Sequence, residues 1–551
     1  MDLKGDSIKE LGVNIHNDFT DSKPKIKAKR FNRKLKLFRE FTLATLSALT
    51  EIKQTQLRCD TGTDNVISQV SALDALACTG VAGIQWKKHL SSRVHVTLAD
   101  RDDVTKLTSN SEANDFSCSE FHLNPLRVPG DLHESQSEKE VHVCNAEAKA
   151  VMVMEAFNFI YLNPQKNATT YFEPAFNSLT CRGLLCFVFP DVSLFARSAH
   201  VVQRYYGVDV VKTEYLKELT ARIIIGSLAR AAARSNKGIM VQYVISFEDY
   251  LLICVKVCRG HAAADTSLTE LAKLQHCRLC EQRNFIPQQL ALLEDPYSLL
   301  ACKCKEKNPG KTAVSLGPMW KGPIYDWDFL NLLHKHGKQI SLSSKFFEVI
   351  HLLLGECMCA QIDQPTGAAP EDKNAKETGE KLRNGTELPA TTQALNEPAL
   401  QGGDSPSADQ RQSNDQSLNS EPSLEKATQP AIPQSEKPMD ITETEASGNP
   451  SEECSESALN TLKRKLEHLE SEKPNEAKRH HKALTDNQRE PKSANVPFYY
   501  NVSKFKRTNI PKLDKLVTIL RCAGYKASRT HFDHSAIRTT ASVDEFLTIL
   551  G

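Results

Sequence analysis

The chain has 551 residues, 40% of them hydrophobic and 25% charged, and its formal net charge is only +1. This length exceeds one ordinary domain, so we expect two or three domains together with disordered stretches. The N-terminus lacks the apolar run of a secretory signal. The sequence contains no apolar stretch of about eighteen residues, so we expect no membrane span. We therefore expect an intracellular protein whose 16 cysteines are reduced thiols or metal ligands.

The first half of the chain alternates between predicted strands and helices. Residues 1–30 are polar and are expected to form a mobile basic N-terminus, and residues 35–49 have the apolar spacing of a helix. Residues 72–77 read as a buried strand, followed by a glycine-bearing turn into a helix. Four further strands are predicted, at residues 94–100, 141–145, 157–162 and 184–189, with a polar insertion at 105–138.

A long helix is predicted at residues 212–235, followed by two strands at 239–247 and 250–258. Only Glu248 and Asp249 separate these two strands, so they form a tight hairpin that places one antiparallel strand in an otherwise parallel sheet. The predicted fold class is therefore α/β, with a Rossmann-like sheet in a domain over residues 31–260.

Residues 261–358 form a second, cysteine-bearing region. Its Cys-Arg-Leu-Cys segment is followed roughly twenty residues later by Cys-Lys-Cys, and two such pairs are typical of a tetrahedral zinc site. We expect structural zinc here, with His276 as an alternative ligand and unrelated reduced thiols as the alternative interpretation. The expected ligands are Cys277, Cys280, Cys302 and Cys304.

Residues 359–495 are rich in Ser, Pro, Glu, Gln, Asn and Thr, and this composition predicts a disordered linker. The basic clusters at 463–465 and 478–482 are typical of nuclear import signals, with a solvated basic run as the alternative. We expect the protein in the nucleus, the nucleolus included, or in the cytoplasm. Order is predicted to return over residues 496–551.

The carboxyl ends of the first predicted strands offer polar and flexible residues: Asp74, Gly80, Asp100 and Asn145. Ligands of open α/β sheets bind at this edge. An acid after the second strand can accept hydrogen bonds from both hydroxyls of a ribose, and glycine in the first turn lets the backbone approach a ligand. Ordinary βα turns are the alternative for each feature taken alone.

Residues 72–86, which include Leu-Asp-Ala-Leu-Ala-Cys-Thr-Gly-Val-Ala-Gly-Ile-Gln-Trp, resemble the S-adenosylmethionine (SAM) loop of the tRNA (guanine-26-N2)-dimethyltransferase family. Other segments resemble the family in the same order, and the nearest resemblance is to its tRNA methyltransferase one-like branch. These segments are residues 31–42, 205–222, 316–326, 497–500 and 528–531.

The resemblance implies a class I SAM methyltransferase domain, an α+β C-terminal domain and tRNA as the partner, with no membrane association. By position it implies that Arg39 contacts SAM, that Asp100 binds the ribose, and that Asn145 with Ala146 reads the adenine amino group. Asn145 stands where the family has aspartate, so this hydrogen bond lacks charge assistance. Ala82 stands where the family usually has arginine.

The resemblance also implies a catalytic loop after the fourth strand, where the family has Asp-Pro, an aromatic residue and glycine. This chain has Asn163-Pro164-Gln165-Lys166, so an acceptor survives but no aromatic face follows it. Lys166 puts a cation where positive charge develops during methylation of guanine N2. We therefore hypothesise that mono- or dimethylation of guanine 26 in tRNA is weak or absent. A catalytically inactive RNA-binding scaffold is the main alternative, and an adenine-N6 methyltransferase is a third.

Basic residues near aromatic ones in the C-terminal part predict RNA contacts. Surfaces of this kind neutralise phosphates and stack on exposed bases, with an ordinary solvated face as the alternative. The residues expected to contact RNA are Lys504, Lys506, Arg507, Arg529, His531 and Arg538, and the basic segment 23–36 is a second expected contact.

Overall fold

The computed structural model describes residues 7–16, 31–61, 68–102, 104–120, 137–166, 168–287, 295, 297–300, 302–310, 312–360, 498–504 and 511–549. The linker predicted at 359–495 lies, except for its first two residues, outside this described part, as do both basic clusters proposed for import and Lys506 with Arg507. No helix in the described ranges is both long and apolar enough to cross a membrane.

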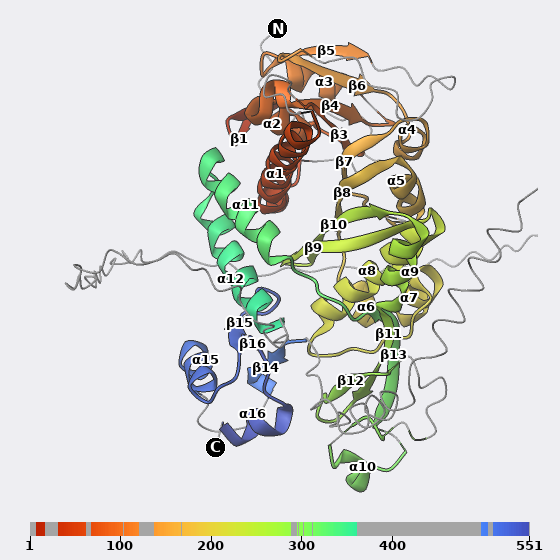
Figure 1. Ribbon diagram of the computed structural model, residues 1–551, viewed down its shortest axis with the longest axis vertical. Coiled ribbons are helices and arrows are strands. Elements are labelled where there is room, and N and C mark those ends of the chain that lie inside the picture. The colour runs from red at the N-terminus through yellow and green to blue at the C-terminus, as the bar shows by residue number, and fades with distance from the viewer. Residues whose placement is uncertain are drawn as a thin grey trace, which may run out of the picture. The chain divides into compact units, whose positions relative to one another are not determined.

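An eight-stranded mixed sheet forms the centre of the first half of the chain, in the order β5-β6-β4-β3-β7-β8-β10-β9 (Figure 1). The strands from β5 to β8 pair in parallel, whereas β10 pairs antiparallel with both β8 and β9. The predicted Rossmann-like sheet with one inserted antiparallel strand is therefore confirmed. The strands are β3 (Val70–Asp74), β4 (Val94–Ala99), β5 (Ser117–Glu120), β6 (Glu140–Cys144), β7 (Phe157–Leu162), β8 (Leu179–Phe189), β9 (Lys237–Phe247) and β10 (Tyr250–Arg259).

The central strands β3 and β4 are buried along their whole length, as expected for parallel strands covered on both faces, and they bury Ser71, His95 and Thr97 together with their apolar residues. Close helix packing depends on Gly83 in α2, where an added Cβ would lie 2.2 Å from a methyl of Leu98. The helices around this sheet are α1 (Lys36–Thr61), α2 (Val81–Leu90), α3 (Thr105–Glu112), α4 (Ala148–Met154), α5 (Phe172–Ser178), α6 (Leu194–Arg197), α7 (Ala199–Tyr206), α8 (Leu216–Arg234) and α9 (His261–Thr269).

Short 3₁₀ turns occur at η1 (Arg33–Leu35), η2 (Ser91–Arg93), η3 (Ala168–Tyr171) and η4 (Val502–Lys504).

The N-terminal segment contains a hairpin that sequence analysis placed in a mobile stretch. Strands β1 (Ser7–Glu10) and β2 (Val13–His16) pair antiparallel across a Leu11-Gly12 turn. Val13 and Ile15 have no exposed surface, and the backbone N–H groups of Asn14 and His16 donate to Oδ1 of Asn114 and Asn110, near the end of α3. This burial fixes residues 7–16, so the expected mobility does not apply to them.

The second region has two small antiparallel sheets with helices, in agreement with the predicted α+β class. One sheet has the order β12-β11-β13 and the other β14-β16-β15. Helices α11 and α12 connect to the first domain, where Phe346 of α12 meets Phe41 of α1 with ring centroids 4.4 Å apart. The elements are β11 (Leu271–Cys277), β12 (Arg283–Phe285), α10 (Cys304–Lys307), β13 (Ala313–Trp320), α11 (Trp327–Ile340), α12 (Ser344–Ala360), β14 (Tyr500–Asn501), α15 (Leu513–Cys522), β15 (Ala527–Arg529), β16 (Ala536–Thr539) and α16 (Val543–Ile549).

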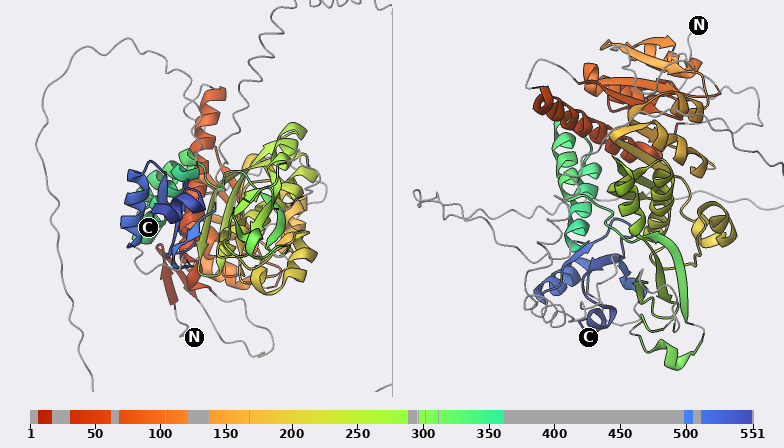
Figure 2. Two further views of the ribbon diagram at one scale, coloured as in Figure 1. Left: turned by 90° about the horizontal axis from the view of Figure 1, so that it is seen from below. Right: turned by 45° about the vertical axis from the view of Figure 1, so that its right-hand side comes forward.

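Arg538 on β16 joins three distant segments in a buried charge network, which we call the Arg538 clamp. Its Nη2 donates to Glu218 Oε2 of α8 at 2.8 Å and to Glu356 Oε2 of α12 at 2.9 Å. Arg222 pairs with Glu218 from the next turn of α8, and His531 Nδ1 lies 2.6 Å from Glu356 Oε1. The C-terminal strands are thereby fixed beside α12, as Figure 2 shows.

Candidate functional site

The predicted edge of the sheet is assembled as expected. Strands β6, β4, β3 and β7 are adjacent and parallel, so the residues that follow them meet at one edge. Backbone hydrogen bonds connect these loops: Ala75 N–H donates to Tyr161 O at 3.0 Å, and Ala77 N–H to Ala99 O at 3.0 Å. Asp74, Asp100, Asn145 and Asn163 are therefore neighbours in space, although 89 residues separate the first from the last.

Gly80 makes the turn between β3 and α2. Its φ of 74° lies in the left-handed region, and it occupies the N-cap of α2. An added Cβ at Gly80 would contact the Leu107, Leu98 and Ile84 side chains at 3.2–3.3 Å. A larger residue would therefore strain both the backbone and the packing under this turn.

Asp100 connects the glycine turn to the second strand. Its Oδ2 accepts the backbone N–H of Cys78 at 3.0 Å, and its Oδ1 accepts the N–H of Asp102 at 3.0 Å. A carboxylate offers about four acceptor positions, so it can hold this loop and also accept from a ligand hydroxyl. Asp100 is only 2% exposed, whereas Asn145 is exposed and Ala146 is half-buried, so the three predicted contacts differ in their access to solvent.

Asp74 ends β3 and is a buried carboxyl with an altered acidity. Burial raises the pKa of Asp74 to about 7, and nearby Asp100 acts in the same direction. The Gly83 backbone N–H and the Arg39 guanidinium oppose this rise, which places Arg39 at the same edge. Asp74 therefore exchanges its proton close to neutral pH.

Arg39, the predicted SAM contact on α1, is held by the N-terminal hairpin. Its Nε donates to Glu10 Oε1 at 2.6 Å and its Nη2 to Glu10 Oε2 at 2.7 Å, while Nη1 donates to Asn32 O at 3.1 Å. Gln85 of α2 also donates to Glu10 Oε1, at 3.0 Å. Arginine has five N–H donors, and these contacts use three of them, so Arg39 retains donors for a ligand carboxylate.

Glu10 is a residue of this site that sequence reasoning missed. It is 7% exposed and contacts both Arg39 and Gln85. The available signal was the Leu11-Gly12 pair between short alternating segments, which is a hairpin pattern.

The predicted catalytic residues Asn163 and Pro164 directly follow β7, which ends at Leu162. Asn163 is half-buried and Pro164 is buried, whereas Gln165 and Lys166 are exposed. Tyr161 of β7 pairs with Asp74 of β3 in the parallel ladder, so the Asn163 loop begins next to the buried Asp74. The placement at the strand end is therefore as expected, and the cationic side chain of Lys166 faces solvent.

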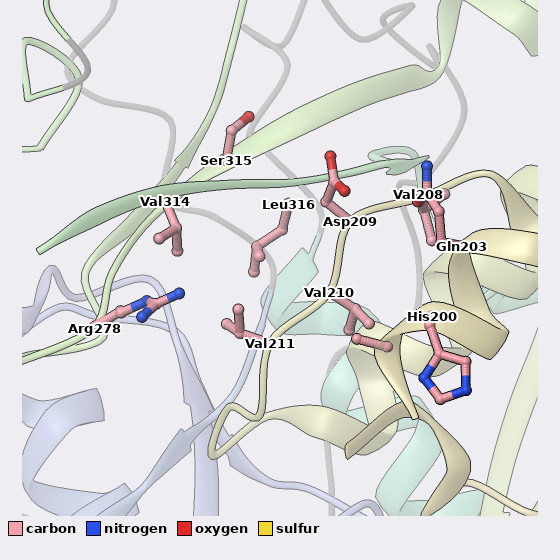
Figure 3. A pocket seen from close by; sticks show the side chains of 11 residues that line it. His200, Gln203, Val208, Asp209, Val210, Val211, Arg278, Val314, Ser315 and Leu316 are labelled. Carbon is pink, nitrogen blue, oxygen red and sulfur yellow. The ribbon is translucent and has the colours of Figure 1, made fainter. Parts of the chain in front are cut away.

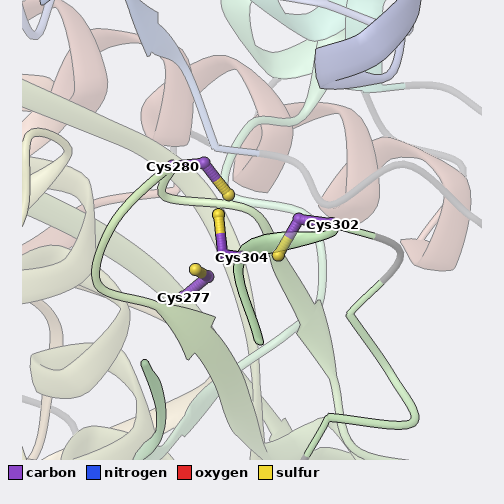
Figure 4. A group of neighbouring side chains, drawn as sticks. All are labelled: Cys277, Cys280, Cys302 and Cys304. Carbon is purple, nitrogen blue, oxygen red and sulfur yellow. The ribbon is translucent and has the colours of Figure 1, made fainter. Parts of the chain in front are cut away.

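The four cysteines of the second region form a compact cluster. Cys277 ends β11, Cys304 begins α10, and the Sγ atoms of all four lie within 4.8 Å of one another (Figure 4). Tetrahedral zinc with Zn–S bonds of about 2.3 Å requires sulfurs about 3.8 Å apart, so this cluster fits a zinc ion. Although burial opposes it, backbone N–H groups of Cys280 and Leu279 lower the pKa of Cys277, which favours the thiolate that a metal binds.

His276 does not complete this cluster. It is 2% exposed, its Nδ1 lies 2.9 Å from the Tyr215 hydroxyl, and burial lowers its pKa to about 3. The metal-ligand geometry is made by cysteines alone among the described residues. The alternative ligand set with His276 is therefore wrong.

The predicted RNA-contacting residues are placed differently from one another. The side chains of His531 and Arg538 are both 2% exposed and bond Glu356, so both stabilise the fold and neither faces a surface. Arg529 is exposed and its Nη1 lies 3.5 Å from Asp514 Oδ1. Lys504 ends η4, and its side chain, like Lys506 and Arg507, lies outside the described part of the structure.

The sheet order, the glycine turn after β3 and the acid after β4 define the methyltransferase class of α/β fold. A solved structure of Trm1 from Pyrococcus horikoshii with S-adenosyl-L-methionine shares this fold, with a TM-score of 0.57 and 16% identity over 99% of each chain. At this identity the likeness establishes the fold alone.

The chain belongs to the N2,N2-dimethylguanosine tRNA methyltransferase family, whose sequence profile matches residues 22–367 and 455–551. The tRNA (guanine(27)-N(2))-dimethyltransferases of Rattus norvegicus and Homo sapiens are both 30% identical to it over 94% of this chain. This chain spans only 60% of the length of either relative. The tRNA (guanine(26)-N(2))-dimethyltransferase of Metallosphaera sedula is 26% identical over 52% of this chain and 67% of its own length. The family resemblance expected from sequence is thus confirmed.

Proposed function

We propose that this chain transfers methyl groups from SAM to the N2 amine of a guanine in tRNA. The observation that carries the proposal is the single edge of the sheet that gathers Asp74, Asp100, Asn145 and Asn163. The relatives that match 94% of the chain are named for guanine 27, so we propose position 27 ahead of the position 26 expected from sequence.

The residues at this edge fit SAM by their chemistry. Arg39 has donors for the methionine carboxylate, Asp100 is an acceptor for the ribose hydroxyls, and Asn145 with Ala146 follows β6 where the adenine would lie. The turn at Gly80 lets backbone approach the ligand. When bound, SAM supplies an electrophilic methyl group on a sulfonium.

The Asn163 loop would orient the guanine. Its side-chain oxygen can accept a hydrogen bond from the N2 amine and so direct the nitrogen lone pair toward the donor, while Pro164 restricts the loop. The target base must leave its stack to reach this edge. The exposed Lys166 lies two residues after Pro164, and its positive charge opposes the charge that develops on the amine.

The test is to incubate the full chain with methyl-labelled SAM and unmodified tRNA, and to map labelled nucleosides by position. We expect N2-methylguanosine or its dimethyl form at position 27, and an at least hundredfold slower reaction for Asn163→Ala. Label in the guanine at position 26 would change only the proposed position. Label in an adenine would show that the substrate base is adenine and not guanine. Lys166→Gly would raise the rate if the cation slows the reaction.

A non-catalytic RNA-binding scaffold is the second candidate, and the exposed Gln165-Lys166 pair favours it. Calorimetric titration with SAM and direct measurement of tRNA binding separate the two candidates. A chain that binds SAM and tRNA but yields no labelled nucleoside, even as Lys166→Gly, would be a scaffold.

We also propose that the cysteine cluster holds structural zinc. Four thiolates fill a tetrahedral site and leave no position for substrate or water, so a catalytic metal role is not supported. Nuclear entry through the basic clusters at 463–465 and 478–482 is a further proposal. Replacing the lysines and arginines of both clusters by alanine in a fluorescent fusion should shift the protein to the cytoplasm.

A further inference from the structure

An open groove of about 510 Å³, drawn in Figure 3, lies beside the turn between Cys277 and Cys280, and no residue assigned to SAM lines it. One wall comes from α7 and the extended residues 208–211, and the other from β13 and the turn between Cys277 and Cys280. Its lining residues are Ala199, His200, Gln203, Val208, Asp209, Val210, Val211, Arg278, Val314, Ser315 and Leu316. Ligand pockets ordinarily measure about 300–1,000 Å³, so the groove can accept a group the size of a nucleotide.

The groove combines an aliphatic centre with polar ends. Figure 3 shows Val211, Val314 and Leu316 between Arg278 on one side and His200 with Gln203 on the other. An aliphatic surface suits the flat face of a base, an arginine suits a phosphate, and amide and imidazole groups suit the edge of a base.

The walls of the groove are fixed by backbone hydrogen bonds. Asp209 and Gly317 exchange two of them, at 3.1 and 2.9 Å, which attaches residues 208–211 to β13. Arg278 N–H donates to Thr312 O at 2.8 Å, and the cysteines on either side of its turn belong to the cluster. The groove is therefore preformed, and the position of Arg278 depends on the cysteine cluster.

Basic side chains outnumber acidic ones around Arg278. Arg278, Lys303, Lys305 and Lys307 are exposed, against Glu281 beside the cysteine turn and the exposed Glu306 of α10. Asp209 is the one acidic residue among those that line the groove. A polyanion therefore suits this surface better than an acidic or neutral peptide does.

We propose that the groove binds one unpaired nucleotide of tRNA outside the methylation site, with its phosphate on Arg278 and its base against the aliphatic floor. The proposal rests on the proposed function, because the groove would be a second binding site for the tRNA that is methylated. The groove also takes the role of RNA contact that was expected for His531, because the side chain of His531 is buried.

The experiment measures binding of fluorescent unmodified tRNA to the full chain by anisotropy at several salt concentrations. We expect Arg278→Ala to weaken binding about tenfold and to reduce the slope of log affinity against log salt by about one. Arg278→Lys should retain the slope and lose part of the affinity. Arg259→Ala, an exposed arginine at the end of β10, is the matched control and should bind like the parent.

Ser315→Glu provides a second variant on the groove. Ser315 is exposed on β13 and pairs with Gln275 of β11, so the new carboxylate faces the RNA without entering the core. We expect it to weaken tRNA binding at least as much as Arg278→Ala. Equal metal content and equal thermal midpoints in parent and variants establish that the fold is retained.

Parental tRNA affinity in both Arg278→Ala and Ser315→Glu would overturn the proposal, as would a parent that does not bind tRNA. Failure of the proposed function has a different signature. A parent that binds tRNA through this groove but transfers no methyl group rejects the enzyme and keeps the groove. Normal methylation with unaffected variants rejects the groove and keeps the enzyme.

Discussion

At the scale of single residues, the position of Arg39 depends on Glu10, a carboxylate in a hairpin near the start of the chain. Both side chains are nearly inaccessible, at 5% and 6% exposure, and they form a bidentate pair. A pair of this kind fixes the plane of the guanidinium as well as its charge. The direction of the remaining Arg39 donors is therefore set by the hairpin.

We predict that Glu10→Gln lowers the free energy of unfolding by about 3 kcal/mol, because it leaves a buried guanidinium without its carboxylate. SAM affinity, measured by calorimetry, should fall about tenfold as Arg39 loses its orientation. Glu248→Gln removes an exposed partner of Lys34 and is the control, with little change expected in either quantity. Tighter SAM binding by Glu10→Gln would instead show that Glu10 competes with the ligand for Arg39.

Asp74 gives a prediction about pH. Burial raises its folded pKa to about 7 from the ordinary 3.8, so the native state keeps a proton that the unfolded chain releases. The stability that this proton provides is complete below pH 3.8 and is lost as the pH rises to 7. Asp74→Asn should therefore flatten the decline in unfolding free energy over this interval.

Urea unfolding at several pH values between 4 and 7 measures this slope. Asp102→Asn, a change at an exposed carboxylate of the same edge, should leave the parental slope in place. If the unfolding free energy of Asp74→Asn falls with pH as steeply as that of the parent, a group other than Asp74 causes the decline.

The residues at the sheet edge could be predicted because they depend on local signals. Asp74, Asp100 and Asn163 each follow a short apolar segment, and parallel strands end at one edge. The contact between Glu10 and Arg39 could not be predicted in this way. The two residues are 29 positions apart, and a contact over that distance produces no repeating pattern in the sequence.

At the scale of elements, the cysteine turn and α10 are two short pieces that the cluster brings together. Neither the four-residue α10 nor the three-residue β12 buries much apolar surface. A metal is the kind of cross-link that small segments of this size require. The strands β11 and β13 beside them were not predicted individually, since their sequences lack a clear alternation.

We predict one zinc ion per chain by elemental analysis, and its loss in Cys302→Ser. Zinc loss should also weaken tRNA binding to the level of Arg278→Ala, because Arg278 lies within the cysteine turn. Cys522→Ser changes an exposed cysteine on α15 and should retain both the metal and the RNA affinity. Full zinc content in Cys302→Ser would place the ion elsewhere.

At the scale of the whole molecule, the Arg538 clamp unites α8, α12 and β16. Although burial opposes ionisation, His531 and Arg538 lower the pKa of Glu356 to about 2. The stability from this carboxylate is therefore present above the ordinary pKa of 4.5 and is lost as the pH falls toward 2. Sequence reasoning did not find the clamp, because Arg538 and Glu218 are 320 residues apart.

We predict that Arg538→Ala lowers the free energy of unfolding by about 3–5 kcal/mol, because it leaves two buried carboxylates without their shared cation. Arg529→Ala removes an exposed arginine of β15 that pairs with Asp514, and it should cost less than about 1 kcal/mol. Chemical denaturation followed by fluorescence compares the two variants. Equal midpoints would show that solvent reaches Glu218 and Glu356.

The clamp connects β16 to a sheet whose last strand in the sequence, β10, ends at Arg259. A shortened chain that stopped ahead of Arg538 would keep all eight strands of the main sheet. Such a chain would lose the cation that Glu218 of α8 and Glu356 of α12 share, and two neighbouring carboxylates without it repel each other. Its loss would therefore act on α8, the long helix that packs against β9 of the main sheet.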